Sequence, residues 1–181
     1  NWIYDVKHDI EVVYNPAQTK RLGIDNIANG NRASFDGNIT LNDNLIVLLQ
    51  DGGISQGGEQ AILNFNGSLR DGTTTSGNLL FQANDTGGAN DNVNGRMTGY
   101  AVLNGNNSSW TGDAVIGGNT SYDFDKTTVL RMGNNLALTA ANDVIMNFNS
   151  MFQTGGKSVT IGSLATNGGD GSFYGQVGTL N

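Results

Sequence analysis

The fold class is decided by residues 103–171, which read LNGNNSSWTGDAVIGGNTSYDFDKTTVLRMGNNLALTAANDVIMNFNSMFQTGGKSVTIGSLATNGGDG. Short β-branched or apolar runs alternate there with clusters of Gly and Asn. The runs are residues 114–116, 128–132, 144–148 and 158–161. Short apolar runs separated by residues that favour tight turns are typical of strands, not helices. The sequence therefore predicts an all-β chain that turns at each Gly/Asn cluster.

The same segment resembles the autotransporter-associated β-strand repeat of bacterial surface proteins. That family opens with L-x-G-x-N, continues with a T-x-L-R-x-G strand, and then has a V-T-I-G-S-L run. Here the opening is residues 103–107, followed by Trp110 and Gly112; residues 128–133 read TVLRMG and residues 158–164 read SVTIGSL. The resemblance implies a right-handed parallel β-helix in a secreted or surface-exposed bacterial protein.

Composition and charge exclude several functions. Only 14% of the residues are charged, against about a quarter in an average domain, and 27 of 181 are glycine. The net charge of −7, with no basic stripe, argues against a nucleic-acid partner and against an anionic membrane surface. The absence of cysteine rules out disulfides, thiolate nucleophiles and Cys-ligated metals.

The apolar runs are too short for a membrane span. The longest, residues 45–49, is far below the length that crosses a bilayer, so no membrane insertion is expected. The chain begins at Asn1 without a methionine, which we interpret as a removed leader or a piece of a longer protein.

Two zones are expected along the chain. Residues 1–32 carry many charges and one alternating run, and they predict an atypical N-terminal cap or docking segment with one extended strand. Residues 33–181 predict a β-solenoid, with the clearest repeat resemblance at 103–171. A period of about 22 residues would give roughly eight coils. Further strands are expected at 38–41, 45–49, 61–65, 78–82 and 97–103.

Stacked coils should place equivalent residues in columns. The predicted inward positions are Leu41, Leu63, Leu80, Leu130, Phe148 and Ile161. Asn side chains at the corners are expected to exchange hydrogen bonds from coil to coil.

The alternating run at residues 9–14 has two interpretations. It is either a plain cap strand or a strand that completes the sheet of a neighbouring molecule. In the second case the assembly contact consists of Ile10, Val12, Val13 and Tyr14.

Other candidate sites are weaker. Asp123 and Asp125 lie two residues apart, so on a strand both carboxylates would share a face and could act as acid and base, with Lys126 or Arg131 as a basic partner. Residues 85–95 and 167–171 are similar to glycine-rich calcium loops, but they do not recur in tandem. The only histidine, His8, lies in the charged N-terminal zone, away from any triad pattern.

Together these observations predict a non-enzymatic extracellular structural protein without a cofactor. It would serve as a β-solenoid stalk, or as a subunit of a head-to-tail surface filament or adhesin. Its partners would be further copies of itself or neighbouring segments of a longer passenger, and host or matrix glycans are a further candidate. The alternative is a carbohydrate-binding or polysaccharide-degrading β-helix that uses Asp123 and Asp125 or exposed aromatics such as Trp110 and Tyr122.

Overall fold

The computed structural model describes residues 3–24, 32–49, 61–83, 97–117, 126–147 and 150–167. All regular structure in these residues is β-strand, and every paired strand is parallel to its neighbour. The all-β prediction is confirmed, and the sheets are parallel as expected.

The strands form three sheets. In spatial order, sheet A contains β1 (Ile3–Val6), β4 (Arg32–Phe35), β7 (Ala61–Phe65), β10 (Met97–Leu103), β12 (Lys126–Met132) and β14 (Ser150–Gln153). Sheet B contains β2 (Ile10–Val12), β5 (Ile39–Leu41) and β8 (Leu69–Asp71). Sheet C contains β3 (Lys20–Ile24), β6 (Leu45–Leu49), β9 (Leu79–Ala83), β11 (Ala114–Ile116), β13 (Val144–Met146) and β15 (Leu164–Thr166).

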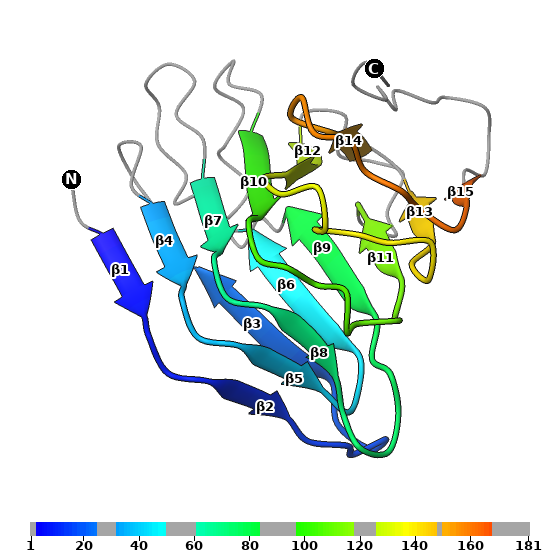
Figure 1. The fold of residues 1–181 in the computed structure, drawn as a ribbon. Helices are drawn as coiled ribbons and strands as arrows, with labels where there is room; N and C mark the ends of the chain where they lie inside the picture. The colour runs from blue at the N-terminus through cyan, green and yellow to red at the C-terminus, as the bar shows by residue number, and fades with distance from the viewer. Residues whose placement is uncertain are drawn as a thin grey trace.

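The chain passes through the sheets in a fixed order (Figure 1). β1, β2 and β3 lie in sheets A, B and C, and β4, β5 and β6 repeat that order beside them, as do β7, β8 and β9. From β10 onward the described strands belong to sheets A and C. In place of a further sheet B strand, the described residues have an isolated bridge between Arg70 and Ser109. Each return of the chain therefore adds a strand to the edge of the sheets already formed.

The expected period of about 22 residues is wrong for most of the chain. Ile3 pairs with Arg32 and Gly99 pairs with Ala61, whereas steps near the expected length occur at the end of sheets A and C, from Thr128 to Ser150 and from Val144 to Leu164. The connections from sheet C to sheet A cause this variation. Residues 84–96 separate β9 from β10, but residues 147–149 separate β13 from β14. Within the described residues sheet A has six strands, fewer than the eight coils expected.

Burial alternates along the strands because successive side chains point to opposite faces. In β6, Leu45, Val47 and Leu49 are buried, while the two residues between them are half-buried on the outer face. Phe65 connects neighbouring strands in the core. Its ring centroid lies 5.6 Å from that of Phe35 and 6.1 Å from that of Phe81.

Three of the predicted inward residues, Leu41, Leu63 and Leu130, are fully buried in this core, and Ile161 is half-buried against it. The prediction that Leu80 points inward is wrong, because β9 places Leu79 and Phe81 in the core and leaves Leu80 half-buried on the other face. Phe148 lies outside the described residues.

Polar side chains link successive turns at the corners, as the sequence predicted. The Asn44 Oδ1 accepts a hydrogen bond from the Asn78 amide, and the Asn78 Oδ1 accepts one from the Asp113 amide, both at 2.9 Å. At another corner, the Asn104 Nδ2 donates to the Asn66 Oδ1 at 2.8 Å. These bonds satisfy polar groups where the backbone leaves one sheet for the next.

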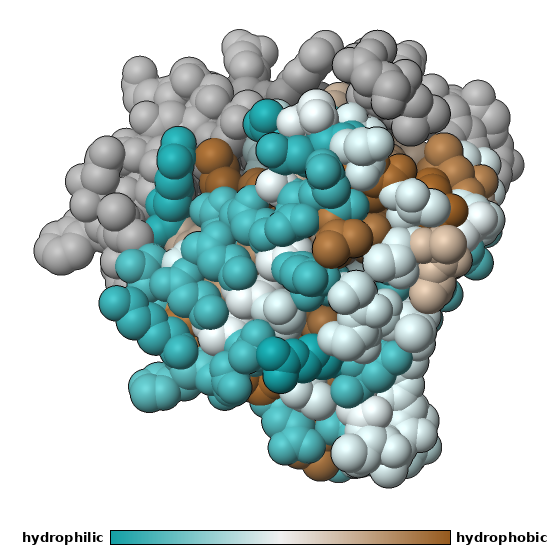
Figure 2. All heavy atoms as spheres, viewed as in Figure 1, coloured by the Kyte–Doolittle hydropathy of each residue, from teal (hydrophilic) through white to brown (hydrophobic). Residues whose placement is uncertain are grey.

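The face of the molecule seen in Figure 2 is mainly polar. Figure 2 shows a largely hydrophilic face among the described residues, with small separate hydrophobic areas. The described residues contain no helix that could cross a membrane.

Candidate functional site at the N-terminal end

The first three strands form one end of all three sheets. Among the described strands, β1, β2 and β3 each have a single neighbour, which is β4, β5 and β6 respectively. The Ile10 amide donates to the Asn38 carbonyl and the Val12 carbonyl accepts from the Asn42 amide, at 2.8 and 3.0 Å. In a parallel ladder the residue between them, Glu11, directs its backbone groups to the opposite side. Among the described residues no strand pairs with that side of β2.

The sequence predicted one strand in residues 1–32, and this is wrong, because the structure has three there and Arg32 begins β4. β1 and β3 escaped detection since each is short and interrupted by charged residues. Their pairing with β4 and β6 supplies the stability that their own sequence pattern does not indicate.

The exposure of inward-facing residues increases toward the N-terminal end of the sheets. Along one inward column the exposed fraction of the side chain is 38% at Val6, 6% at Phe35 and 1% at Phe65. Another column shows the same change, since Leu22 is half-buried whereas Val47 beside it is fully buried. Apolar surface is therefore accessible at the N-terminal end.

A groove of about 500 Å³ lies between β2 and β3. We call it the N-terminal groove; it is lined by Ile10, Glu11, Val12, Val13, Tyr14, Asn15, Gln18, Lys20, Arg21, Leu22 and Leu45. Val13 and Tyr14 are the most exposed large apolar residues of its lining, at 64% and 54%. The groove thus combines apolar residues with charged residues from both strands, Glu11 from β2 and Lys20 and Arg21 from β3.

All four predicted assembly residues, Ile10, Val12, Val13 and Tyr14, line this groove. Sequence reasoning missed Leu22 and Leu45, which come from sheet C. The alternating run identified one wall, but the opposite wall depends on how the chain returns to the next sheet.

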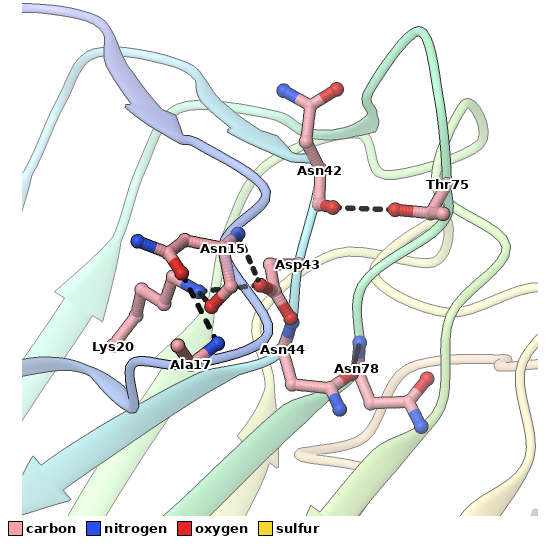
Figure 3. Close-up of polar contacts among 8 residues, drawn as sticks. All are labelled: Asn15, Ala17, Lys20, Asn42, Asp43, Asn44, Thr75 and Asn78. Atoms are coloured by element: carbon pink, nitrogen blue, oxygen red, sulfur yellow. Dashed lines mark hydrogen bonds and ion pairs between the residues drawn. The ribbon is translucent and has the colours of Figure 1, made fainter.

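An ion pair holds the connection between β2 and β3 in place (Figure 3). The Lys20 ammonium contacts the Asp43 carboxylate and donates to the Asn15 carbonyl. The Asn15 amide donates to the same carboxylate at 2.9 Å. We call each passage of the chain through the sheets a circuit; β1 to β3 form the first and β4 to β6 the second. Asp43 belongs to the turn between β5 and β6, so this contact ties the first circuit to the second.

These contacts lower the pKa of Asp43 to about 2. The hydrogen bond from Lys20 is the largest cause, followed by the amides of Asn15 and Asn44. The pKa of Asp36 is also lowered, mainly by the hydrogen bond from Asn66 and then by that from Ser34. Both carboxylates act as acceptors that link neighbouring circuits.

The predicted acid–base pair cannot be placed, because Asp123 and Asp125 lie outside the described residues. Lys126 begins β12, and Arg131 is exposed on the same strand. The calcium-loop candidate at 85–95 also lies outside the described residues, as does 167–171 apart from Asn167. In the described part of the chain, no group of three or more His, Asp or Glu side chains could hold a metal ion.

Trp110 has a structural position. Its side chain is fully buried, and its Nε1 donates to the Gly77 carbonyl at 2.8 Å. A buried indole cannot present its face to a sugar ring, so the suggested platform at Trp110 is wrong. Tyr122, the other suggested platform, lies outside the described residues.

No protein-family model, curated protein or solved structure matches this chain. Its function is therefore inferred from the geometry of the N-terminal end and from the sequence motifs themselves.

Proposed function

We propose that this chain is a non-enzymatic extracellular structural protein, a right-handed β-solenoid that serves as a stalk or filament subunit and joins further copies head to tail. The observation that carries the proposal is the N-terminal end, where three parallel sheets stop at the same circuit beside an accessible groove. The extracellular location and the handedness follow from the repeat resemblance of residues 103–171.

The direction of the strands supports a second copy as the partner. All strands of a sheet are parallel, so a strand at one edge of the sheet has the same direction as the strand at the opposite edge. β14 is the last strand of sheet A, and β15 is the last strand of sheet C. When copies are stacked head to tail, β14 and β15 of one copy approach β1 and β3 of the next in the parallel sense. Such a contact does not close, so it extends into a fibre.

Accessible apolar surface at the N-terminal end supports the same proposal. Backbone pairing alone gives little specificity, whereas exposed side chains beside an open edge can direct a partner strand. Val13 and Tyr14 provide such side chains. An exposed sheet edge with adjacent apolar residues is also a site that proteins normally cover or protect.

Carbohydrate binding and polysaccharide cleavage have less support. Trp110 is buried, and Asp123 and Asp125 lie outside the described residues, so no described contact favours them.

The test is self-association of the full chain, measured by sedimentation velocity and electron microscopy at neutral pH. We expect fibres or head-to-tail oligomers for the wild type and isolated particles for the double variant Val13→Glu, Tyr14→Glu. Both side chains are more than half exposed, so the substitutions leave the core intact. Leu136→Glu is the matched control, since Leu136 is 46% exposed and does not line the N-terminal groove. A wild type that stays monomeric at high concentration would refute the proposal.

A further inference from the structure

The turn from sheet A to sheet B places glycine at the same position in three successive circuits, as Gly37, Gly67 and Gly105. Each turn repeats one hydrogen-bond arrangement. The Phe35 carbonyl, for example, accepts from the amides of Asn66 and Gly67 at 2.8 and 3.1 Å. The turns therefore lie directly on one another.

This close stacking leaves no room for a side chain. A Cβ on Gly67 would overlap the carbonyl of Gly37, and a Cβ on Gly105 would overlap the carbonyl of Gly67. The obstacle is backbone, which cannot move aside as a flexible side chain does. In these three turns the position has room only for glycine.

In the first circuit the same position is occupied by His8. Val6 pairs with Phe35 and Ile10 pairs with Ile39. The connection between the two paired residues has the same length in both circuits, so His8 is aligned with Gly37. A Cβ on Gly37 would overlap the His8 carbonyl, so the His8 backbone lies directly beneath Gly37. His8 is exposed, and its own Cβ takes the corresponding direction, away from the second circuit and toward the place of a preceding turn.

We infer that His8 is a register stop. It prevents a further complete circuit from stacking on the N-terminal end in the register of the following turns. A second copy can then still pair its β15 with β3 beside the N-terminal groove, but the chain that follows its β14 cannot lie over the turn between β1 and β2 in the register of the later turns. Natural sheets commonly protect open edges with residues that obstruct extension. Only the identity of the partner rests on the proposed function; the exclusion follows from the glycine positions.

Adding a circuit to the full chain tests this inference. A second copy of residues 3–31 is inserted directly before Ile3, so that the original His8 acquires a turn beneath it. Three versions carry His8 unchanged, His8→Ala or His8→Gly at the original position. Hydrogen exchange of the β2 amides reports whether the added circuit pairs with the original one.

We expect protection of β2 in the His8→Gly version to exceed that in the other two by about ten- to a hundred-fold, because only glycine removes the Cβ. The His8→Ala version separates the Cβ from the imidazole, since alanine keeps the first and lacks the second. Equal protection in the His8 and His8→Gly versions would overturn the inference. The two proposals can fail separately. Protection of β2 in the His8→Gly version alone supports the register stop, and a wild type that does not self-associate refutes the proposed head-to-tail function.

Discussion

Gly67 illustrates at the scale of a single residue how closely the parallel turns approach. The carbonyl oxygen of Gly37 occupies the place where a Cβ on Gly67 would be. We predict that Gly67→Ala lowers the free energy of unfolding by about 2–3 kcal/mol, because backbone must shift to relieve the overlap.

The matched control is Gly156→Ala, measured in the same urea titration. Gly156 has no atom within 4 Å of its Cβ position, but its φ of 76° is unfavourable for alanine. That strain costs about 1–2 kcal/mol. A Gly67→Ala variant as stable as the wild type would show that the turns can separate without cost.

The ion pair between Lys20 and Asp43 predicts a pH dependence. The pKa of Asp43 is lowered to about 2 in the folded protein, from an ordinary value of 3.8. A lowered pKa means that the carboxylate contributes stability above its unfolded pKa, and that this contribution is lost as the pH falls from about 4 to about 2.

We therefore expect Asp43→Asn to reduce the loss of stability over that pH range, as followed by urea unfolding at several pH values. Lys20→Met should reduce it too, and adding Asp43→Asn to Lys20→Met should change little further. An unchanged slope in Asp43→Asn would mean that the contact does not persist in solution.

At the scale of strands, the sequence predicted those that lie between two neighbours and have clear alternation. β6, β7, β10 and β11 have the predicted bounds. Residues 158–161 were predicted as a strand but form none, although Val159 and Ile161 pack against the core. The apolar pattern there reports burial. It cannot reveal that, among the described residues, the last strand of sheet B is β8, so that residues 158–161 have no strand beside them to pair with.

The site was predictable only in part for the same reason. Ile10, Val12, Val13 and Tyr14 follow one another along the chain, so alternation reveals them. Leu22 and Leu45 join them only through the pairing of Lys20 with Leu45 in β3 and β6. Register between distant segments depends on connection lengths, which vary in this chain and have no local signature.

Trp110 lies in the segment between β10 and β11, which is joined to sheet B by the Arg70–Ser109 bridge and by hydrogen bonds such as that from the Leu69 amide to the Asn107 Oδ1 at 2.7 Å. Its indole is fully buried. We predict that Trp110→Ala costs about 3–5 kcal/mol in urea unfolding. Trp110→Phe, which lacks the donor to the Gly77 carbonyl, should cost less.

Leu136→Ala serves as the surface control for Trp110, with an expected cost below about 0.5 kcal/mol. Normal stability combined with lost glycan binding in Trp110→Ala would favour a sugar platform over the structural role.

At the scale of the whole molecule, stability depends on neighbours along the stack. Strands in the middle, such as β7 and β10, have a partner on each side, whereas β1, β2 and β3 have one each. In proteins built from stacked units, each unit contacts only adjacent units, so an end opens more readily than the centre. The end with the accessible groove is also the end where a bound partner would add the missing neighbour.

This arrangement predicts a concentration-dependent pattern of hydrogen exchange. In dilute solution the amides of β2 and β3 should exchange faster than those of β7 and β10. At concentrations where sedimentation shows association, β1 and β3 should become protected, because β14 and β15 of the next copy pair with them, while β7 and β10 change little. The Val13→Glu, Tyr14→Glu variant should lose this gain, and Leu136→Glu should keep it. Association without added protection at β1 and β3 would place the contact elsewhere on the molecule, because a strand that joins the N-terminal end must accept or donate hydrogen bonds along those edges.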